Sequence, residues 1–412
     1  MKRRLVLGVL AVLAAACVSS LATADEGMWM LHQIKDLDHA RLKAMGLALT
    51  PEELWNPATG TGLASAVCSL GGCSASFVSP DGLVATNHHC AFRAIQMNST
   101  PEHDYITTGF LAASRAEELE AKGSRIYVFL GYDDVTDTVR ASLTSDMTPA
   151  QRTAALERTQ KELTAACETP GRRCRVAEMF GGGTYYLFRT LEIRDVRLVY
   201  APPRSIGEYG GETDNWMWPR HTGDFSYLRA YVGPDNAPAD YAPENVPYKP
   251  ARWLKVASEP LEAGDFAMIL GYPGKTTRFR PSAAIKDDVE YVLPTRIAIL
   301  TDWIAILQAR SATDKAVEIK LANVLKGLLN SYKKYQGELE GLRAIDLAGR
   351  HHGEEAELSA WIRADAARIE RFGNPVPALE QIIAAQRATT ERDLLLEWLP
   401  RSSSLQIGRA HV

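Results

Sequence analysis

Two short apolar-rich runs joined by a turn sequence predict a β-hairpin. The runs are Ala75–Val78 and Leu83–Thr86, and Ser-Pro-Asp-Gly joins them. Proline presets φ for a turn and glycine accepts a positive φ, so this junction favours a tight connection. The second strand is expected to continue through Thr-Asn-His-His-Cys, which brings Cys90 opposite Cys73 across the hairpin. A disulfide between these cysteines would close the hairpin.

Other segments with strand patterning follow at intervals along the chain. Short strands with Gly/Pro turns and few periodic helices are typical of closed antiparallel barrels. Three segments have helical patterning, the last two charged and alanine-rich like surface helices inserted between strands: Ile34–Leu47, Ala112–Lys122 and Pro149–Cys167. The predicted strands are Arg125–Leu130, Thr190–Tyr200, Phe225–Val232, Trp253–Val256 and Phe266–Leu270.

The pattern changes after Gly271-Tyr-Pro-Gly274, where helical spacing replaces short strands. Ile297, Leu300, Ile304 and Leu307 fall on one helical face. Similar spacing continues through 321–342, and the lysines and glutamates of 315–342 are interpreted as a solvated helix face. We therefore place a domain boundary near 275–285. The expected fold is mainly β over 25–280, with an α-helical domain over 281–399.

Residues 1–24 are typical of an export signal. Lys2-Arg-Arg precedes the apolar core Leu5–Val18, and Ala22-Thr-Ala fits a cleavage site. The core is shorter than the roughly 20 apolar residues that span a bilayer, and no other stretch is expected to span one. Cys17 would permit a lipoprotein signal, but an alanine stands where such signals usually carry leucine. We expect a periplasmic protein with no membrane association after cleavage.

Export permits disulfides, and the cysteine spacing agrees with them. Beside the pair Cys73 and Cys90, Cys167 and Cys174 flank Glu-Thr-Pro-Gly-Arg-Arg, a turn-like loop that favours a local bridge. Cys68 is then left alone and is interpreted as a small buried hydrophobic residue. The alternative is that Cys68 competes with Cys73 for Cys90. The net charge of −4, with no basic stripe, argues against a nucleic-acid partner.

His89 adjoins a predicted half-cystine at the end of the hairpin. A histidine held rigidly in this way is how a general base is positioned for a serine nucleophile. A metal site formed by His88, His89 and Cys90 is the alternative. Adjacent ligands on a strand diverge and a bridged cysteine offers no thiolate, so no metal or other cofactor is expected.

Two motifs resemble one family of peptidases. Gly71 to Cys90 reads Gly-Gly-Cys-x-Ala-Ser-Phe-Val-Ser-x-x-Gly-Leu-x-x-Thr-Asn-His-His-Cys, and Asp214 to Asp224 reads Asp-Asn-Trp-Met-Trp-Pro-Arg-His-Thr-Gly-Asp. Both resemble the bacterial periplasmic serine dipeptidyl-peptidases, the family of dipeptidyl aminopeptidase BII and dipeptidyl-peptidases seven and eleven. The resemblance covers 25–399. It implies a chymotrypsin-like double β-barrel, incomplete here, with a truncated α-helical cap domain.

The resemblance implies an enzyme that releases dipeptides from the free N-terminus of oligopeptides. It makes His89 the base and Asp224 the acid of a His-Asp-Ser triad. The residues agree, because Asp224 precedes a predicted strand and can orient a histidine there. Asp224 as a turn cap, or Asp214 as the acid, are the alternatives. Since neighbours on a strand face opposite ways, His88 is expected to be a buried partner of backbone groups, and His221 to support the site.

The family grips the substrate's amino terminus with residues that match Asn215, Trp216 and Asn330. An ammonium has three donors and needs converging acceptors, which side-chain carbonyls beside an aromatic wall supply. Asn330 lies in the predicted helical domain, so that domain is expected to cover the cleft and exclude longer substrates. The resemblance also implies a homodimer for the full-length enzyme.

The family's serine nucleophile lies in a Gly-Asn-Ser-Gly-like motif far beyond the triad aspartate. No Gly-x-Ser-Gly occurs in these 412 residues. Residues 400–412 read as a non-native tail, so we expect the chain to be the N-terminal half of the enzyme, inactive alone. The alternative is a non-catalytic periplasmic peptide-binding protein on a chymotrypsin-like scaffold. Genomic sequence beyond codon 399 would distinguish the two.

Overall fold

The computed structural model describes residues 28–274, 277 and 279–402. The chain forms two compact units, Met1–Gly62 with Leu261–Ala267, and Leu63–Pro260 with Met268–Val412. The predicted signal at 1–24 and the part of the predicted tail at 403–412 lie outside the described residues.

The described part of the first unit contains three short helices, two of which replace the single helix predicted over Ile34–Leu47. The expected helix over Ile34–Leu47 is interrupted at Leu37, which is extended, and the Asp38 side chain starts a new helix by accepting a hydrogen bond from Arg41 N at 3.0 Å. Leu54 is among the buried apolar residues of this unit. The helices are the 3₁₀-helix η1 (Leu31–Asp36), α2 (His39–Ala44) and α3 (Pro51–Leu54).

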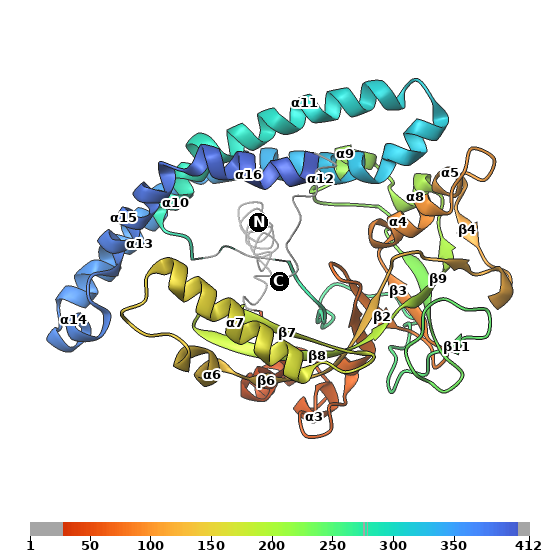
Figure 1. Ribbon diagram of the computed structural model, residues 1–412, viewed down its shortest axis with the longest axis horizontal. Helices are drawn as coiled ribbons and strands as arrows, with labels where there is room; N and C mark the ends of the chain where they lie inside the picture. The colour runs from red at the N-terminus through yellow and green to blue at the C-terminus, as the bar shows by residue number, and fades with distance from the viewer. Residues whose placement is uncertain (1–27, 275–276, 278, 403–412) are drawn as a thin grey trace, which may run out of the picture. The chain divides into compact units, whose positions relative to one another are not determined.

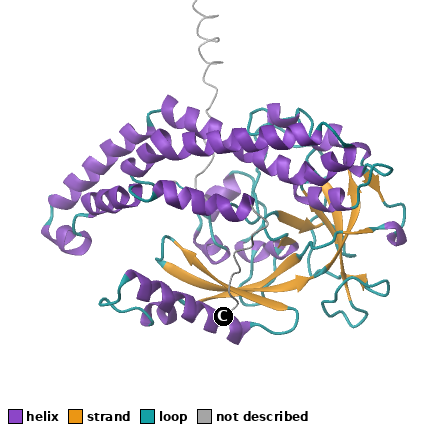
Figure 2. Cartoon of the chain, turned by 45° about the horizontal axis from the view of Figure 1, so that its top comes forward, coloured by secondary structure: helices purple, strands orange, loops and turns teal. Residues whose placement is uncertain are grey.

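The second unit is built on an 11-stranded antiparallel sheet, drawn in orange in Figure 2. Its path is β4-β9-β10-β3-β2-β1-β6-β8-β7, with β11 paired to β10 and β5 paired to β9. The strands are β1 (Val67–Ser69), β2 (Ser74–Phe77), β3 (Leu83–Thr86), β4 (Phe110–Leu111), β5 (Leu119–Glu120), β6 (Ile126–Asp134), β7 (Arg172–Met179), β8 (Thr184–Ile193), β9 (Asp195–Ala201), β10 (Ser226–Val232) and β11 (Val246–Pro247).

The predicted hairpin is present as β2 and β3, with Phe77 opposite Val84. Its turn needs glycine, because Gly82 has φ +68° and a Cβ there would lie 2.8 Å from two carbonyl oxygens. The prediction that the second strand runs on to Cys90 is wrong. The strand ends at Thr86, and a helix begins at His88.

Short helices connect the strands of this sheet. The prediction for Pro149–Cys167 is confirmed, since α7 has these bounds. The helix predicted over Ala112–Lys122 is wrong, because part of that stretch pairs with β9 as β5. These helices are η2 (Leu63–Ala66), α4 (His88–Met97), α5 (Tyr105–Thr108), η3 (Arg115–Glu117), α6 (Thr136–Ala141), α7 (Pro149–Cys167), α8 (Arg204–Gly207) and α9 (Gly211–Asp214).

The strand predictions are partly confirmed. Strands at Arg125–Leu130 and Phe225–Val232 are present as β6 and β10, but Thr190–Tyr200 is divided between β8 and β9. The structure assigns no strand to Trp253–Val256 or Phe266–Leu270, all of which it describes. Apolar runs alone do not make a strand, because a strand needs a partner edge for its backbone groups.

The core of the sheet lies between the strands and α4. Phe77, Phe92, Ile126 and Leu228 are almost completely buried in one apolar cluster. Burying such a side chain contributes about 1.5–3 kcal/mol, so this cluster is a main source of stability. It fixes the helix that begins at His88 against the strands on either side of it.

Helices dominate the chain after residue 281, as the pattern predicts, and α11 and α12 run side by side in Figure 1. Leu300 and Ile304 are buried on α11 as predicted, together with Trp398. The helices are α10 (Ser282–Asp287), the π-helix η4 (Asp288–Val292), α11 (Leu293–Ser311), α12 (Lys315–Ala344), α13 (Leu347–Arg363), α14 (Ala366–Phe372), α15 (Pro375–Arg387) and α16 (Thr390–Ser402).

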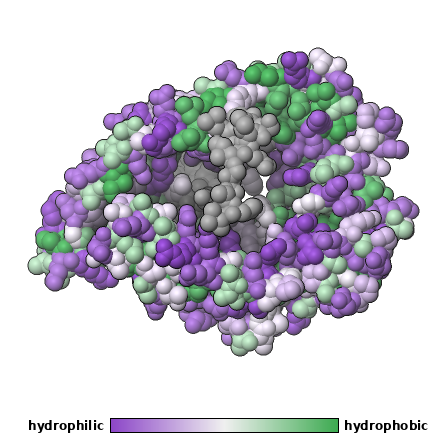
Figure 3. All heavy atoms as spheres, viewed as in Figure 1, coloured by the Kyte–Doolittle hydropathy of each residue, from purple (hydrophilic) through white to green (hydrophobic). Residues whose placement is uncertain are grey.

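One stretch of this helical region is strongly apolar. Among the described residues, Ser282–Ser311 is long and apolar enough to cross a membrane by length and composition, so the prediction that no such stretch follows the signal is wrong on that criterion. Core helices pass the same test. Apolar side chains also gather in the part of Figure 3 where Figure 1 draws α11 and α12. Ile306 on α11 and Val324 on α12 are exposed.

Candidate active site

His89 lies in the first turn of α4, immediately after β3. Asn87 precedes the helix with extended backbone, so the chain turns sharply from strand to helix there. Successive residues of a helix are about 100° apart, and this separates the two histidines: the side chain of His89 is 53% exposed whereas His88 is completely buried. The two rings differ in burial as expected, but because of a helix and not because of strand alternation.

Strand pairing brings Asp224 to His89. In the antiparallel pair of β3 and β10, Thr86 lies opposite Ser226. The ladder ends at this pair, and Asp224 comes two residues before Ser226 while His89 comes three residues after Thr86, so both residues lie at the same end of the two strands. The His89 ring Nδ1 is 2.7 Å from Asp224 Oδ2, and the backbone N–H of His89 donates to Asp224 Oδ1 at 3.0 Å. Asp224, and not Asp214, is therefore the aspartate beside this histidine.

The environment keeps the Asp224 carboxylate ionised. Its burial opposes ionisation, but the side-chain and backbone hydrogen bonds from His89 outweigh burial and lower the pKa of Asp224 to about 2. A carboxylate only accepts hydrogen bonds, so the His89 Nδ1 carries the proton. With Nδ1 as the protonated nitrogen, Nε2 is the ring atom that can accept a proton, which is the arrangement of a general base.

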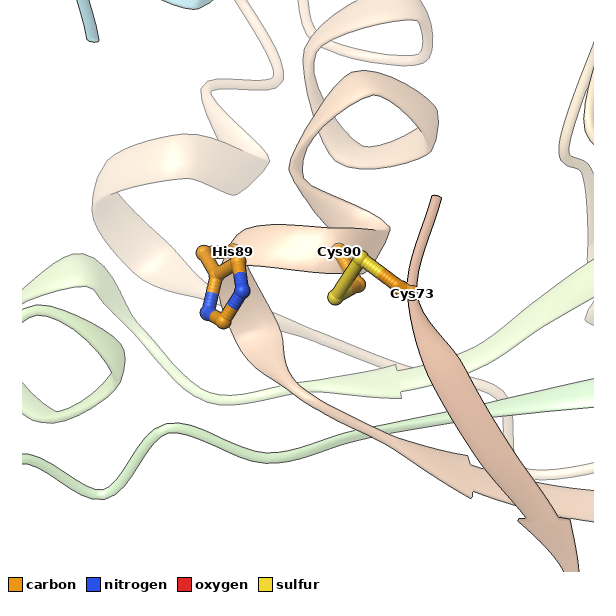
Figure 4. A group of neighbouring side chains, drawn as sticks. All are labelled: Cys73, His89 and Cys90. Carbon is orange, nitrogen blue, oxygen red and sulfur yellow. A yellow bond between two sulfur atoms is a disulfide. The ribbon is translucent and has the colours of Figure 1, made fainter. Parts of the chain in front are cut away.

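Two disulfides are present, as the sequence predicts. Cys73 and Cys90 are bridged with their Cα atoms 6.1 Å apart, and Cys167 and Cys174 at 6.0 Å. Figure 4 shows the first bridge beside the His89 ring at the start of α4. Cys68 is the free buried cysteine of the described residues, and burial raises its pKa to about 12.

Cys73, His89 and Cys90 lie close enough to hold a metal ion by distance alone. Both cysteines are consumed by the disulfide, so neither supplies the thiolate that a metal needs. The His89 Nδ1 is engaged by Asp224. The chemistry of this group therefore favours an anchored base over a metal ligand set.

His88 is buried behind the exposed pair. Both of its ring nitrogens lack a hydrogen-bond partner, so the expected bonds to backbone groups are not formed. Burial, with the nearby Lys326 charge, lowers the pKa of His88 to about 4. A Cβ on Gly207 would lie 2.6 Å from the ring, so this position requires glycine.

A second group of polar side chains meets between α12 and the loop that follows α8. Asn215 Nδ2 donates to Asn330 Oδ1 at 3.1 Å, and the Trp216 indole N–H lies 3.1 Å from both the side-chain and backbone oxygens of Asn330. Asn215 Nδ2 also donates to Glu212 Oε2 at 3.1 Å. These three residues, predicted from two distant segments, are thus in direct contact.

Two lysine contacts near the site were not predicted from the sequence. Lys326 is not part of a solvated face, because it pairs with Glu208 and its side chain is only 23% exposed. Lys333 donates to the backbone oxygens of Glu212 and Thr213. The mixed charges of α12 hid this, since helical spacing alone does not show which lysines face a partner. His221 is exposed and lies in the loop before Asp224.

A profile of the family described as Peptidase S46 matches residues 24–410. The chain belongs to the S46 peptidase family. This S46 chain is 39% identical over 371 residues to an Asp/Glu-specific dipeptidyl-peptidase of Shewanella putrefaciens, covering 90% of this chain and 50% of the relative. It is 38% identical over 357 residues to a dipeptidyl-peptidase 7 of Capnocytophaga gingivalis, covering 86% and 50%.

A solved structure agrees with this membership. The crystal structure of Porphyromonas endodontalis DPP11 in complex with the dipeptide Arg-Asp matches with a TM-score of 0.81 at 35% identity. The match covers 90% of this chain and 54% of that one. The S46 chain therefore spans about half the length of the relatives it matches.

Proposed function

We propose that this S46 chain belongs to a serine dipeptidyl aminopeptidase, which releases dipeptides from the free N-terminus of oligopeptides. His89 is the general base and Asp224 the acid that orients it. The observation that carries the proposal is the 2.7 Å contact between His89 Nδ1 and Asp224 Oδ2, in a chain whose relatives are named dipeptidyl-peptidases.

The catalytic steps follow from this geometry. Asp224 holds the Nδ1 proton, and Nε2 of His89 takes the proton of a serine hydroxyl as that oxygen attacks the scissile carbonyl. The same ring then gives the proton to the leaving amine. The serine is proposed to lie in a part of the enzyme outside this sequence, because no Gly-x-Ser-Gly occurs in the 412 residues.

Asn215, Trp216 and Asn330 are proposed to bind the substrate's free amino group. Their mutual contacts gather amide oxygens and an indole at one place, which suits an ammonium ion. Holding the amino terminus at a fixed distance from the reacting groups explains removal of a fixed number of residues. This contact supports assignment of the three residues to one site.

The proposal includes the architecture and setting of the enzyme. The sheet is assigned to an incomplete chymotrypsin-like double barrel over 25–280, and the helices to a cap domain over 281–399. The full-length enzyme is proposed to be a periplasmic homodimer. The disulfides support an oxidising compartment, since such bonds persist there.

The test is an assay of the full-length gene product on chromogenic dipeptide substrates. We expect release of dipeptides, sensitive to a serine-directed phosphonate, and no release by residues 25–412 alone. One relative is named Asp/Glu-specific and another of similar identity is not, so substrates with acidic and with apolar side chains are both assayed. A full-length protein that binds oligopeptides without turnover would instead support the peptide-binding alternative.

A further inference from the structure

Glu208 and Lys326 form an ion pair in a partly buried position close to the proposed site. The Glu208 side chain is 14% exposed and that of Lys326 is 23% exposed. Lys326 Nζ lies 4.1 Å from the centre of the Phe92 ring, in cation–π geometry. Arg204 Nε also donates to Glu208 at 2.8 Å. The ammonium therefore contacts a carboxylate and an aromatic face on different elements.

The pair connects three elements that carry site residues. Lys326 lies on α12 four residues before Asn330, so both occupy one face of that helix. Glu208 directly follows α8 and begins the loop that leads to Trp216. Phe92 lies on α4, one turn after His89. The proposed ammonium site and the proposed base are thus joined through Lys326.

Further contacts run along the same face of α12. Lys333 donates to two backbone oxygens of α9, and Asn330 contacts Asn215 and Trp216, which follow α9. At the other end, Gln96 on α4 donates to two backbone oxygens of α12 at 2.7 and 2.9 Å. Lys326 lies between these two groups of contacts, where α4, the loop and α12 meet.

A partly buried ion pair is seldom a large source of stability. Removing the two charges from water costs free energy, and the attraction between them offsets about the same amount. Leaving one charge buried without its partner is strongly unfavourable. Burial lowers the pKa of Lys326, although the Glu208 charge acts in the opposite direction. Burial alone would raise the pKa of Glu208, but the Lys326 charge outweighs it and the pKa of Glu208 is lowered. Such a pair specifies one arrangement of the elements that it joins.

We propose that Glu208 and Lys326 are positioning residues that set the length of the released product. By fixing α12 and the loop after α8 against α4, they fix the separation between the ammonium-binding side chains and His89. A fixed separation allows two residues, and not one or three, to fit before the scissile bond. This inference rests on the proposed function.

The test uses Lys326→Met and Glu208→Gln in the full-length protein, with synthetic peptides and mass analysis of the products. Small misplacements of reacting groups are costly, so we expect kcat/KM to fall roughly ten- to a hundredfold, mainly in kcat, with tripeptides among the products. Lys326→Arg keeps the positive charge, so this variant should still release dipeptides. Lys334→Met is the control, because Lys334 is exposed and its ion pair with Glu338 at 3.0 Å lies within α12 and joins no second element.

Two outcomes would overturn the inference. One is that both variants behave like Lys334→Met, and the other is that activity falls while dipeptides remain the only product. If Lys326→Met does not fold, the double variant Glu208→Gln/Lys326→Met carries the same test, since it removes both charges of the partly buried pair. Absence of dipeptide release by the wild-type protein would count against the proposed function itself, so the two failures are distinguishable.

Discussion

The two groups of site residues are held in different ways. His89 and Asp224 are fixed by the backbone, because β3 pairs with β10 and the His89 N–H donates to the aspartate. A disulfide at Cys90 adds a covalent link. In contrast, Asn215 and Asn330 meet only through side chains from elements far apart in sequence.

This difference separates the chemistry from the selectivity of the proposed enzyme. A pair held by strand pairing keeps its geometry when neighbouring side chains change. A site made of side-chain contacts depends on each contact, because every ordered side chain must offset its lost rotamer freedom. Substitutions in the first group should therefore stop turnover, and those in the second should change which substrates are accepted.

The largest effect is expected from the base. His89→Ala in the full-length protein should lower kcat on every peptide substrate by roughly a millionfold, because the group that takes the nucleophile's proton is lost. The preference for a free over an acetylated amino terminus should not change. Steady-state kinetics on both substrate types measures this, with His352→Ala, at an exposed position of α13, as the control. A His89→Ala variant with near wild-type kcat would exclude His89 as the base.

The disulfide beside the base should matter for stability. The Cys73–Cys90 bridge spans 17 residues and the Cys167–Cys174 bridge 7. By loop-closure entropy, loss of the first should cost about 3 kcal/mol and loss of the second about 2 kcal/mol. Urea unfolding of the two double Cys→Ser variants measures both. We expect the first variant alone to lower activity, and equal activity in both would show that the bridge does not anchor His89.

The proposed ammonium site should give a smaller and more selective effect. Losing a hydrogen bond to a charged group costs about 1.5–3 kcal/mol, so Asn215→Ala or Asn330→Ala should reduce kcat/KM about ten- to a hundredfold on free peptides. Acetylated peptides should be affected little, so the variants discriminate less. Asn374→Ala, at an exposed residue before α15 whose side chain makes no capping hydrogen bond, is the control. Undiminished preference for a free amino terminus would place the ammonium site elsewhere.

Local sequence patterns predicted much of the fold. The strand predictions that failed depended on whether a neighbouring strand was available for pairing. The hairpin turn, α7 and the buried face of α11 follow from turn chemistry and apolar spacing within one segment. The strands expected at Trp253–Val256 and Phe266–Leu270 are missing, although their composition favours strands. Whether an apolar run becomes a strand depends on a neighbour elsewhere in the chain, which spacing cannot show.

The site was predictable where its residues lie in long motifs. His89 and Asp224 were predicted from such motifs, and the structure brings them into contact. The two disulfides were predicted from the hairpin and from a turn-like loop, and both are present. The helix at His88 was missed, because an apolar hairpin gives no signal for where its second strand ends. Lys326 was missed too, since a lysine among alternating charges looks like any other until its partner is known.

Protonation of Asp224 should give the smallest effect, and one that depends on pH. The pKa of Asp224 falls from an ordinary 3.8 to about 2 in the folded chain. A carboxyl group whose pKa is lower in the folded chain stabilises the fold at pH values above its unfolded-state pKa. This stabilisation is lost as the pH falls through its folded-state pKa. The difference of about two units corresponds to about 2 kcal/mol, present at pH 7 and lost between about pH 4 and pH 2.

Urea unfolding of wild type and Asp224→Asn at pH 7, 5, 4 and 3 tests this directly. The asparagine keeps the size of the side chain but cannot ionise, so the wild type should be more stable by about 2 kcal/mol at pH 7. That advantage should begin to shrink below about pH 4, since the wild-type carboxylate then gains a proton in the unfolded state. Asp302→Asn, on an exposed position of α11, controls for loss of a surface charge. An advantage that stays constant from pH 7 to pH 3 would mean that the His89 hydrogen bonds do not hold Asp224 in its ionised form.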